Sequence, residues 1–505
     1  MSLRKLASET PIYGLSSILG RGLYFLLTPL YTGFFSEDTA PLGVVAHIFS
    51  IVSVLMVLST LRLDVAYFRQ YGKQSHDKLF GSAFLTMAGI GGIIGVGLLL
   101  GSGPLSTFFG YQEYQWLIAL AGGILWFDSM VELPLAKLRM ESKPWRFAAV
   151  RMTGIAINLA LNLFWLYFLP KWPDAPAWMT TSFSGIGYIF LANLVSSAVV
   201  FLFVSPELKG MSWSIDFSIL RKLLKFSLPL VIVGFSYIIN EMLDRQLLPL
   251  LWSGGSDEGF ALNGIYAQNY KLAMLLALFT QAFRYGAEPF FFRESGSKNA
   301  PENYARLAKY FLIAALLGCL VVALYLPAFS QLFLQGSEYR TGSDVVPILL
   351  MANLCLGMYY NFSVWYKVTD NTKFGAYISV GGAIITIVLL VLLIPKYGFY
   401  GCAWTTLICY AVMMKLTWWL GRKHYPIPYD IKAMWGYAAL AIAIFGAYWL
   451  LSPKLGSSVL DLAVSGGSIA TWAANIGLAT AGLLTFALAV WIKERKKLFP
   501  SKSTT

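Results

Sequence analysis

The chain has 505 residues, of which 57% are hydrophobic and only 12% are charged. Soluble domains are about one-quarter charged, so this composition excludes an ordinary soluble protein and indicates an all-α, polytopic membrane protein. The formal net charge of +13 does not indicate a nucleic-acid partner, because the basic residues follow a membrane topology.

Apolar runs bounded by charged residues, prolines and glycines predict about fourteen transmembrane helices. In chain order the predicted ranges are 10–35, 41–68, 79–101, 114–138, 145–169, 180–204, 219–251, 260–292, 304–326, 343–368, 373–394, 398–423, 431–452 and 466–492.

The distribution of lysine and arginine predicts how these helices are oriented. If the N-terminus is cytoplasmic, most of the 38 basic residues fall in cytoplasmic loops or in the tail at 493–497. Loops on the cytoplasmic side of a membrane carry an excess of lysine and arginine. We therefore expect an even number of helices, with the N- and C-termini both in the cytoplasm. The basic loops are also expected to contact membrane lipids.

The chain repeats itself with an offset near 220 residues. Four stretches recur in the same order: 14–30 as 234–250, 43–47 as 264–268, 67–72 as 291–296, and 169–172 as 394–397. Six helices per repeat is an even number, so the halves would be related by an axis along the membrane normal. The repeat predicts an N-terminal lobe at 1–210, a C-terminal lobe at 211–425, and two further helices with a basic tail at 426–505. Chance similarity between apolar helices is the alternative.

Basic residues inside the predicted helices are candidates for lining a cationic cavity. These candidates are Arg21, Arg62, Arg151, Arg245, Lys271 and Arg284. A charge at the centre of a bilayer costs at least about 3 kcal/mol, so such a residue is expected to face a bundle interior or a wet cavity. Arg21 has no acidic residue three or four positions away. Planar guanidinium groups suit phosphate oxygens, so the expected ligand is an anion.

Acidic residues inside the helices form a second group of candidates, for a polar cavity or for a coupling cation (H⁺ or Na⁺). They are Asp128, Glu132, Glu241, Asp244 and Glu288. Asp128 and Glu132 share one helix face, whereas Glu241–Arg245 and Arg284–Glu288 have the spacing of ion pairs within a helix. The alternative interpretation is that such pairs only hold the bundle together.

The motifs of most enzymes and metal sites are missing from the sequence. The cysteines (Cys319, Cys355, Cys402 and Cys409) lie singly in apolar segments without CxxC spacing, and GxxxxGK[ST] does not occur. A membrane glycan polymerase is the enzyme alternative, and it would show a sizeable outside loop with catalytic acids or arginines. We therefore predict no enzyme, no catalytic residue, no metal site and no cofactor.

Two segments resemble a known family. SSILGRGLYFLLTPLYTGFF with GVVAHIFSIVSVL and LRLDVAYFRQYG, and later LIPKYGFYGCAWTTLICYAV, are similar to the polysaccharide-transporter family of bacterial lipid-linked oligosaccharide flippases. That family shares a superfamily with lipid II flippases and with multidrug and toxin extruders. The resemblance implies two six-helix lobes around a central cavity, often with two further helices, in the bacterial inner membrane.

The resemblance also implies a function. The expected substrate is an oligosaccharide linked to undecaprenyl diphosphate, flipped from the inner to the outer leaflet by alternating access for cell-surface polysaccharide synthesis. Arginines on the first, second and eighth helices help form the cavity in the lipid II branch, and Arg21, Arg62 and Arg284 are similarly placed by helix. The glycan polymerase machinery is a candidate partner. A lipid II-type flippase and a cation-coupled multidrug extruder remain alternatives.

Overall fold

The computed structural model describes residues 14, 18–72, 75–177, 179 and 185–498. Within these ranges the regular structure is entirely helical and contains no strand, so the predicted all-α class is confirmed. Parts of the predicted helices 10–35 and 180–204 lie outside the described residues. The chain divides into two compact units, of which the first comprises 1–267 and 379–405 and the second comprises 268–378 and 406–505. The lobe boundaries expected from the repeat remain a prediction.

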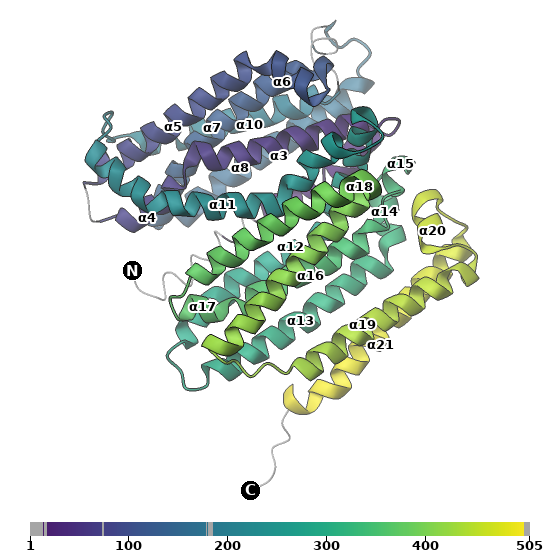
Figure 1. The fold of residues 1–505 in the computed structure, drawn as a ribbon. Helices are drawn as coiled ribbons and strands as arrows, with labels where there is room; N and C mark the ends of the chain where they lie inside the picture. Colours follow the sequence, from purple (N-terminus) through teal and green to yellow (C-terminus); the bar gives the residue numbers. More distant parts are fainter. Residues whose placement is uncertain (1–13, 15–17, 73–74, 178, 180–184, 499–505) are drawn as a thin grey trace. The chain divides into compact units, whose positions relative to one another are not determined.

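The first unit contains the helices of the N-terminal half together with segments from further along the chain (Figure 1). Its helices are α2 (Thr28–Phe34), α3 (Ala40–Thr60), α4 (Leu63–Gln70), α5 (His76–Leu100), α6 (Ser102–Phe109), α7 (Gln115–Met140), α8 (Pro144–Leu163), α10 (Gly187–Val204) and α11 (Phe217–Leu251). It also holds the start of α12 (Ser256–Glu294) and the middle of α18 (Lys373–His424).

The second unit contains the remainder of α12 and both ends of α18. Its other helices are α13 (Ala300–Leu324), α14 (Leu326–Phe333), α15 (Ser337–Arg340), α16 (Val345–Phe362), α17 (Val364–Val368), α19 (Ile431–Leu451), α20 (Val459–Ser465) and α21 (Ile469–Leu498). The helix α14 takes the same place in the second repeat that α6 takes in the first, as a short helix after the third predicted span.

Among the described residues, eleven helices are long and apolar enough to cross a membrane. One of them, α18, has 52 residues and would be about 78 Å long if straight, well beyond a hydrocarbon core of about 30 Å. It turns at Gly398, whose φ of 52° and ψ of −130° are not helical, and it therefore covers two predicted spans. The helix α12 matches the predicted span 260–292 but does not meet the same apolar criterion.

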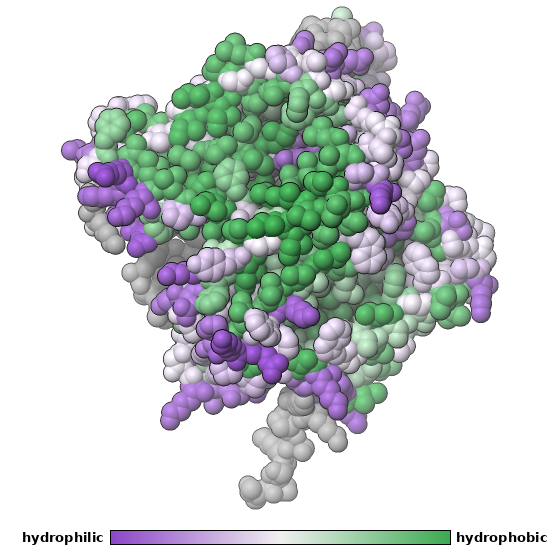
Figure 2. Space-filling model, in the orientation of Figure 1, coloured by the Kyte–Doolittle hydropathy of each residue, from purple (hydrophilic) through white to green (hydrophobic). Residues whose placement is uncertain are grey.

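Exposed apolar side chains fit this membrane-spanning assignment. Ile93 and Leu100 on α5 are 75% and 78% exposed, and Leu392 on α18 is 61% exposed. Figure 2 shows hydrophobic residues over much of the visible surface, with hydrophilic residues gathered toward helix ends. Large exposed apolar surfaces are uncommon on soluble proteins, so the chain is a multi-pass membrane protein.

The predicted span 41–68 is two helices in the structure. Helix α3 stops at Leu61 and α4 starts at Leu63, because Leu61 and Arg62 adopt left-handed backbone angles with φ of 46° and 54°. This conformation costs an L-residue roughly 1–2 kcal/mol, so the surrounding packing must hold it. Over the same stretch the offset between the repeats grows from 221 at Gly43 to 224 at Tyr67. The break lies where the first repeat is shorter.

Candidate functional site

Arg151 and Glu132 form the centre of a charged cluster in the first unit. The guanidinium Nη2 of Arg151 on α8 lies 3.5 Å from Oε1 of Glu132 on α7, and the two side chains are 43% and 31% exposed. An ion pair that is this open to its surroundings contributes at most about 1 kcal/mol. Arg151 can therefore exchange its partner for another anion at little cost.

The helical segment 18–25 brings Arg21 to this cluster. Gly20 packs closely against Ile155, one turn along α8 from Arg151. Tyr24 lies within electrostatic range of both Asp128 and Arg151. Because Arg21 and Tyr24 are three residues apart on one helix, their side chains share a face. Arg21 is exposed, and it forms no ion pair with any residue in the described ranges.

Asp128 and Arg62 complete the cluster in the first unit. Asp128 stands one turn before Glu132 on α7 and is hydrogen bonded to Ser197 of α10. Arg62 lies against Gly234 of α11, since a Cβ placed there would come within 3.0 Å of the guanidinium Nε. Asp64, next to Arg62, interacts electrostatically with Glu132, Arg62 and Arg139. The predicted residues Arg21, Arg62, Arg151, Asp128 and Glu132 are therefore grouped in one unit.

A second charged cluster lies in the second unit around Glu288. Its Oε1 accepts from Nζ of Lys367 at 2.9 Å and lies 3.5 Å from Nη2 of Arg284. The guanidinium carbon of Arg284 also stands 4.0 Å above the ring of Tyr360, a cation–π geometry that holds the arginine in place. Arg284 and Glu288 form the predicted pair within α12, and Lys367 of α17 joins them.

The predicted residues on α11 are in a different setting. Asp244 and Arg245 are buried, at 5% and 8% exposure, and their charged groups are 3.9 Å apart. Tyr266 donates a hydrogen bond of 2.7 Å to Asp244 Oδ2, and Arg245 donates one of 2.9 Å to the carbonyl of Glu241. These groups form an interior polar network of the first unit.

Lys271 lies further along α12, in the second unit, where its Nζ donates to Gln268 Oε1 at 2.8 Å. It is not part of the cluster around Glu288, since it precedes Arg284 by more than three helical turns. For the described residues, no group of three or more His, Cys, Asp or Glu side chains could hold a metal ion.

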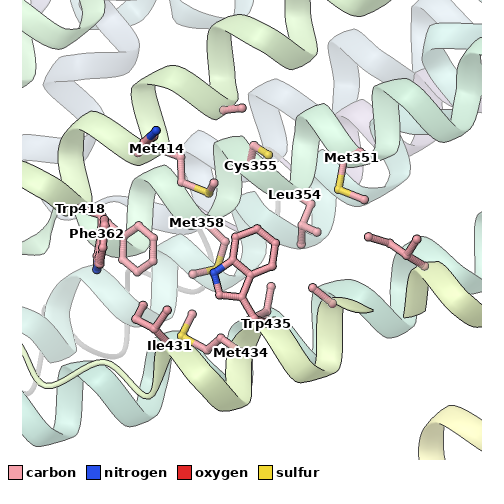
Figure 3. A pocket seen from close by; sticks show the side chains of 15 residues that line it. Met351, Leu354, Cys355, Met358, Phe362, Met414, Trp418, Ile431, Met434 and Trp435 are labelled. Atoms are coloured by element: carbon pink, nitrogen blue, oxygen red, sulfur yellow. The ribbon is translucent and has the colours of Figure 1, made fainter. Parts of the chain in front are cut away.

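A large apolar groove opens in the second unit, between α13, α16, α18 and α19 (Figure 3). Its volume is about 510 Å³. The side chains that line it are mainly methionine, aromatic and aliphatic: Leu312, Met351, Leu354, Cys355, Met358, Phe362, Ala411, Met414, Trp418, Ile431, Met434, Trp435, Ala438 and Ile442. Lys415 adds one charge to this lining. Such a groove suits a long hydrocarbon, and methionine and aromatic side chains adapt easily to a flexible chain.

Comparison with known proteins identifies the family. The family described as "Polysaccharide biosynthesis protein" matches residues 39–311, which is more than half of the chain. The chain belongs to this family. The resemblance of its opening and late segments to polysaccharide transporters is thereby confirmed. No curated protein matches the chain.

Solved structures show the fold of this family member. It is similar to the lipid II flippase MurJ in an inward closed conformation, with a TM-score of 0.74 and 14% identity over 96% of this chain and 99% of that chain. It is also similar to an inward-facing multidrug resistance MATE transporter of the MOP superfamily, with a TM-score of 0.60 and 16% identity over 81% and 95% of the two chains. The *Vibrio cholerae* MATE transporter VcmN gives 0.54 and 16% over 83% and 96%. At these identities the likeness shows the fold.

Several residues that matter in this family member were not among the sequence candidates. Lys367 lies in the last turn of the predicted span 343–368, close enough to a span end to pass as an interfacial lysine. Tyr24 and Tyr360 are uncharged, and the search for candidates considered charges alone. The helix periodicity of Arg21 and Tyr24 could have identified Tyr24, whereas the contact between α12 and α17 could not be read from spacing.

Proposed function

We propose that the chain is a flippase that moves an oligosaccharide linked to undecaprenyl diphosphate from the cytoplasmic to the periplasmic leaflet of the bacterial inner membrane by alternating access. The product would serve synthesis of a surface polysaccharide such as O-antigen, capsule or exopolysaccharide. The observation that carries this proposal is the grouping of Arg21, Arg62 and Arg151 within the first unit of a polysaccharide biosynthesis protein with the fold of MurJ.

The diphosphate is recognised by arginines whose charge remains available. Arg21 is exposed and Arg151 is held only by a partly exposed pair with Glu132. Charge-assisted hydrogen bonds from guanidinium groups to phosphate oxygens are stronger than neutral ones and can be bidentate. The diphosphate therefore docks on Arg21 and Arg151, with Arg62 beside them.

The lipid tail occupies the apolar groove of the second unit. Burying hydrocarbon contributes roughly 25 cal/mol per Å² of apolar surface, so the groove stabilises the tail while the charged head stays with the arginines. Trp435 and Phe362 point into the groove from opposite walls (Figure 3), and both offer large apolar faces to a prenyl chain.

Coupling to a cation is assigned to the acidic candidates. Asp128 and Glu132 lie directly beside the arginines, so a proton or Na⁺ bound there changes the field that the diphosphate meets. Glu241, Asp244 and Glu288 are the other candidates, and the interior network around Asp244 places its carboxylate away from that cluster.

The decisive experiment removes Arg21. Arg21→Ala should abolish export of surface glycan in cells and flipping in reconstituted vesicles, whereas Arg21→Lys should retain part of the activity. Arg306→Ala, an exposed arginine on α13, is the matched control and should export normally. Membrane abundance of each variant is measured by immunoblot. Normal export by Arg21→Ala would contradict the proposal.

A lipid II-type flippase is the second candidate, because the MurJ likeness extends over 96% of the chain. Expression of the chain in cells depleted of their own lipid II flippase separates the two functions. Rescue of growth would indicate a peptidoglycan precursor as substrate. Failure of rescue, together with loss of surface glycan on gene deletion, would support the oligosaccharide.

A further inference from the structure

The cluster around Glu288 contains two cations that share one carboxylate. Lys367 and Arg284 both reach Oε1 of Glu288, at 2.9 Å and 3.5 Å. The three side chains are between one-quarter and two-fifths exposed, so none is sealed inside the unit. We propose that Glu288 is an internal counter-ion that an incoming diphosphate displaces, so that Arg284 and Lys367 become a second anion site of the transport cycle. This inference rests on the proposed function and adds Lys367 and the role of Glu288 to it.

A diphosphate is a stronger partner for this pair of cations than a carboxylate. It offers more negative charge and more acceptor oxygens than the two oxygens of Glu288. Lys367 is a compact charge with three donors, and Arg284 presents a planar fork. Tyr360 holds the guanidinium of Arg284 from one side at 4.0 Å, so the arginine stays in position when Glu288 moves away.

Asn361 supplies an independent sign that the site expects a ligand. It is 3% exposed and lines the same small cavity as Arg284, Glu288 and Lys367. Its Nδ2 donates to the carbonyl of Gly357 at 3.0 Å, which fixes the orientation of the amide. Within the described part of the chain, its Oδ1 accepts from no donor. A buried acceptor without a donor is costly.

The missing donor is a hydroxyl or a water molecule that arrives with a phosphate head group. In this conformation the cavity measures about 10 Å³, room for roughly one water molecule. Movement of the Glu288 side chain is what enlarges it. The closed cavity and the bridging carboxylate are therefore two aspects of one unloaded state.

The same charge order occurs in the other repeat. Arg62 and Asp64 follow each other on the second predicted span as Arg284 and Glu288 do on the eighth. Asp64 interacts with Arg62 and also with Arg139, which lies at the end of the next long helix, α7. One acid between two cations therefore stands at equivalent places in the two repeats. Packing needs specific to one unit do not account for this recurrence.

The role of Glu288 in the cycle is release. While the diphosphate is bound, the free carboxylate competes for Arg284 and Lys367, so it keeps affinity low enough for the head group to leave. Removal of the charge should strengthen binding and slow transport. This opposite effect on binding and on transport distinguishes a displaced counter-ion from a residue that only orients Arg284.

The test uses the full-length chain in lipid nanodiscs, with inorganic pyrophosphate and farnesyl diphosphate as probes in calorimetric titrations. Glu288→Gln should raise affinity for both probes roughly tenfold, because a like charge is removed from the site. Lys367→Met should lower affinity in the wild-type and in the Glu288→Gln background, and Lys367→Arg should restore it. Glu302→Gln, an exposed acid on α13, is the control and should change nothing. Thermal unfolding of each variant verifies folding.

The outcomes separate this inference from the proposed function. Unchanged or weaker binding of farnesyl diphosphate by Glu288→Gln, while the wild type binds it, overturns the inference and leaves the function standing. Tighter pyrophosphate binding by Glu288→Gln without any preference for the prenyl diphosphate supports the anion site and removes the lipid-linked substrate. Failure of every variant to bind either probe overturns both.

Discussion

Gly43 and Gly264 lie against each other so closely that a methyl group on either would collide with the backbone of the opposing helix. A Cβ on Gly43 would overlap the carbonyl oxygen of Phe260, and one on Gly264 would overlap that of Thr39. The pairs Thr39–Phe260 and Gly43–Gly264 are equivalent in the repeat, because each is separated by 221 residues. The contact is therefore symmetric on exchange of the two repeats, as in a two-fold interface.

Alanine at either glycine should prevent this approach of α3 and α12. We expect Gly43→Ala and Gly264→Ala each to lower the thermal unfolding midpoint by several degrees, because backbone atoms on both sides cannot move aside as a side chain can. The clash would also break the 2.9 Å hydrogen bond from Asn263 Nδ2 to the Gly43 carbonyl. Gly89→Ala, where a Cβ would meet nothing within 4 Å, is the control and should be neutral or slightly stabilising. Equal stability of all three variants would contradict the symmetric contact.

A buried ion pair fastens the last helix to α13. Lys309 Nζ lies 2.7 Å from Glu494 Oε2, with side chains 7% and 1% exposed, and Tyr437 donates to Glu494 Oε1 at 2.6 Å. Lys309→Met should destabilise the second unit by about 3–5 kcal/mol, since it leaves a buried carboxylate without its cation.

The double variant Lys309→Met/Glu494→Gln should recover much of that loss, because no charge is then left unpaired. Chemical denaturation in detergent measures both values, and a double variant no better than the single one would contradict the pairing. Lys493→Met, whose ammonium lies 4.6 Å from the Tyr437 ring, removes a neighbouring charge and serves as the control. It should cost no more than about 1 kcal/mol.

The loop before α19 should make stability sensitive to alkaline pH. Burial raises the pKa of the Tyr429 phenol above its ordinary value of 10.0, so the folded state holds that proton more tightly than the unfolded state does. Its contribution is complete below pH 10 and is lost as the pH rises beyond that value. The phenol oxygen has no hydrogen-bond partner in the described structure. Tyr429→Phe should therefore be as stable as the wild type or more so, and it should lose less stability between pH 9 and pH 11, roughly the range of phenol ionisation. A steeper alkaline loss in the variant would contradict this.

Filling the apolar groove should separate the tail from the head group. Ala438 lines the groove, and Ala438→Trp should obstruct it. We expect flipping of the full undecaprenyl substrate to fall at least about tenfold, while binding of pyrophosphate is unchanged, because only the hydrocarbon loses its buried surface. Ala439→Trp, on the exposed side of the same helix, is the control. Normal flipping by Ala438→Trp would place the tail elsewhere.

Apolar length and basic-residue placement were sufficient to predict the helices, because a bilayer forces long apolar segments into helical form. The break at Leu61 and Arg62 was not predictable, since neither residue type favours a left-handed backbone and only the packing around it holds the angles. The turn of α18 at Gly398 was placed within a few residues, because glycine and the preceding Pro395 punctuate the apolar run.

The charged site was only partly accessible from sequence. Spacing along one helix identified Arg284 with Glu288, and the pair is present in the structure. Arg151 and Glu132 lie on different helices, so their contact depends on how α7 packs on α8. The same limit applies to Lys367, which reaches Glu288 from α17. Contacts between helices require the tertiary arrangement, which periodicity alone does not contain.

The attachment of Glu494 to Lys309 bears on how such proteins gain or lose segments. A shortened gene that ends before α21 would strand an ammonium group in a dry interior, so deletion alone would be punished at once. Divergence between shorter and longer transporters on this lineage would then have to pass through an intermediate in which position 309 had already become neutral. The same consideration warns against trimming the C-terminus to aid crystallisation.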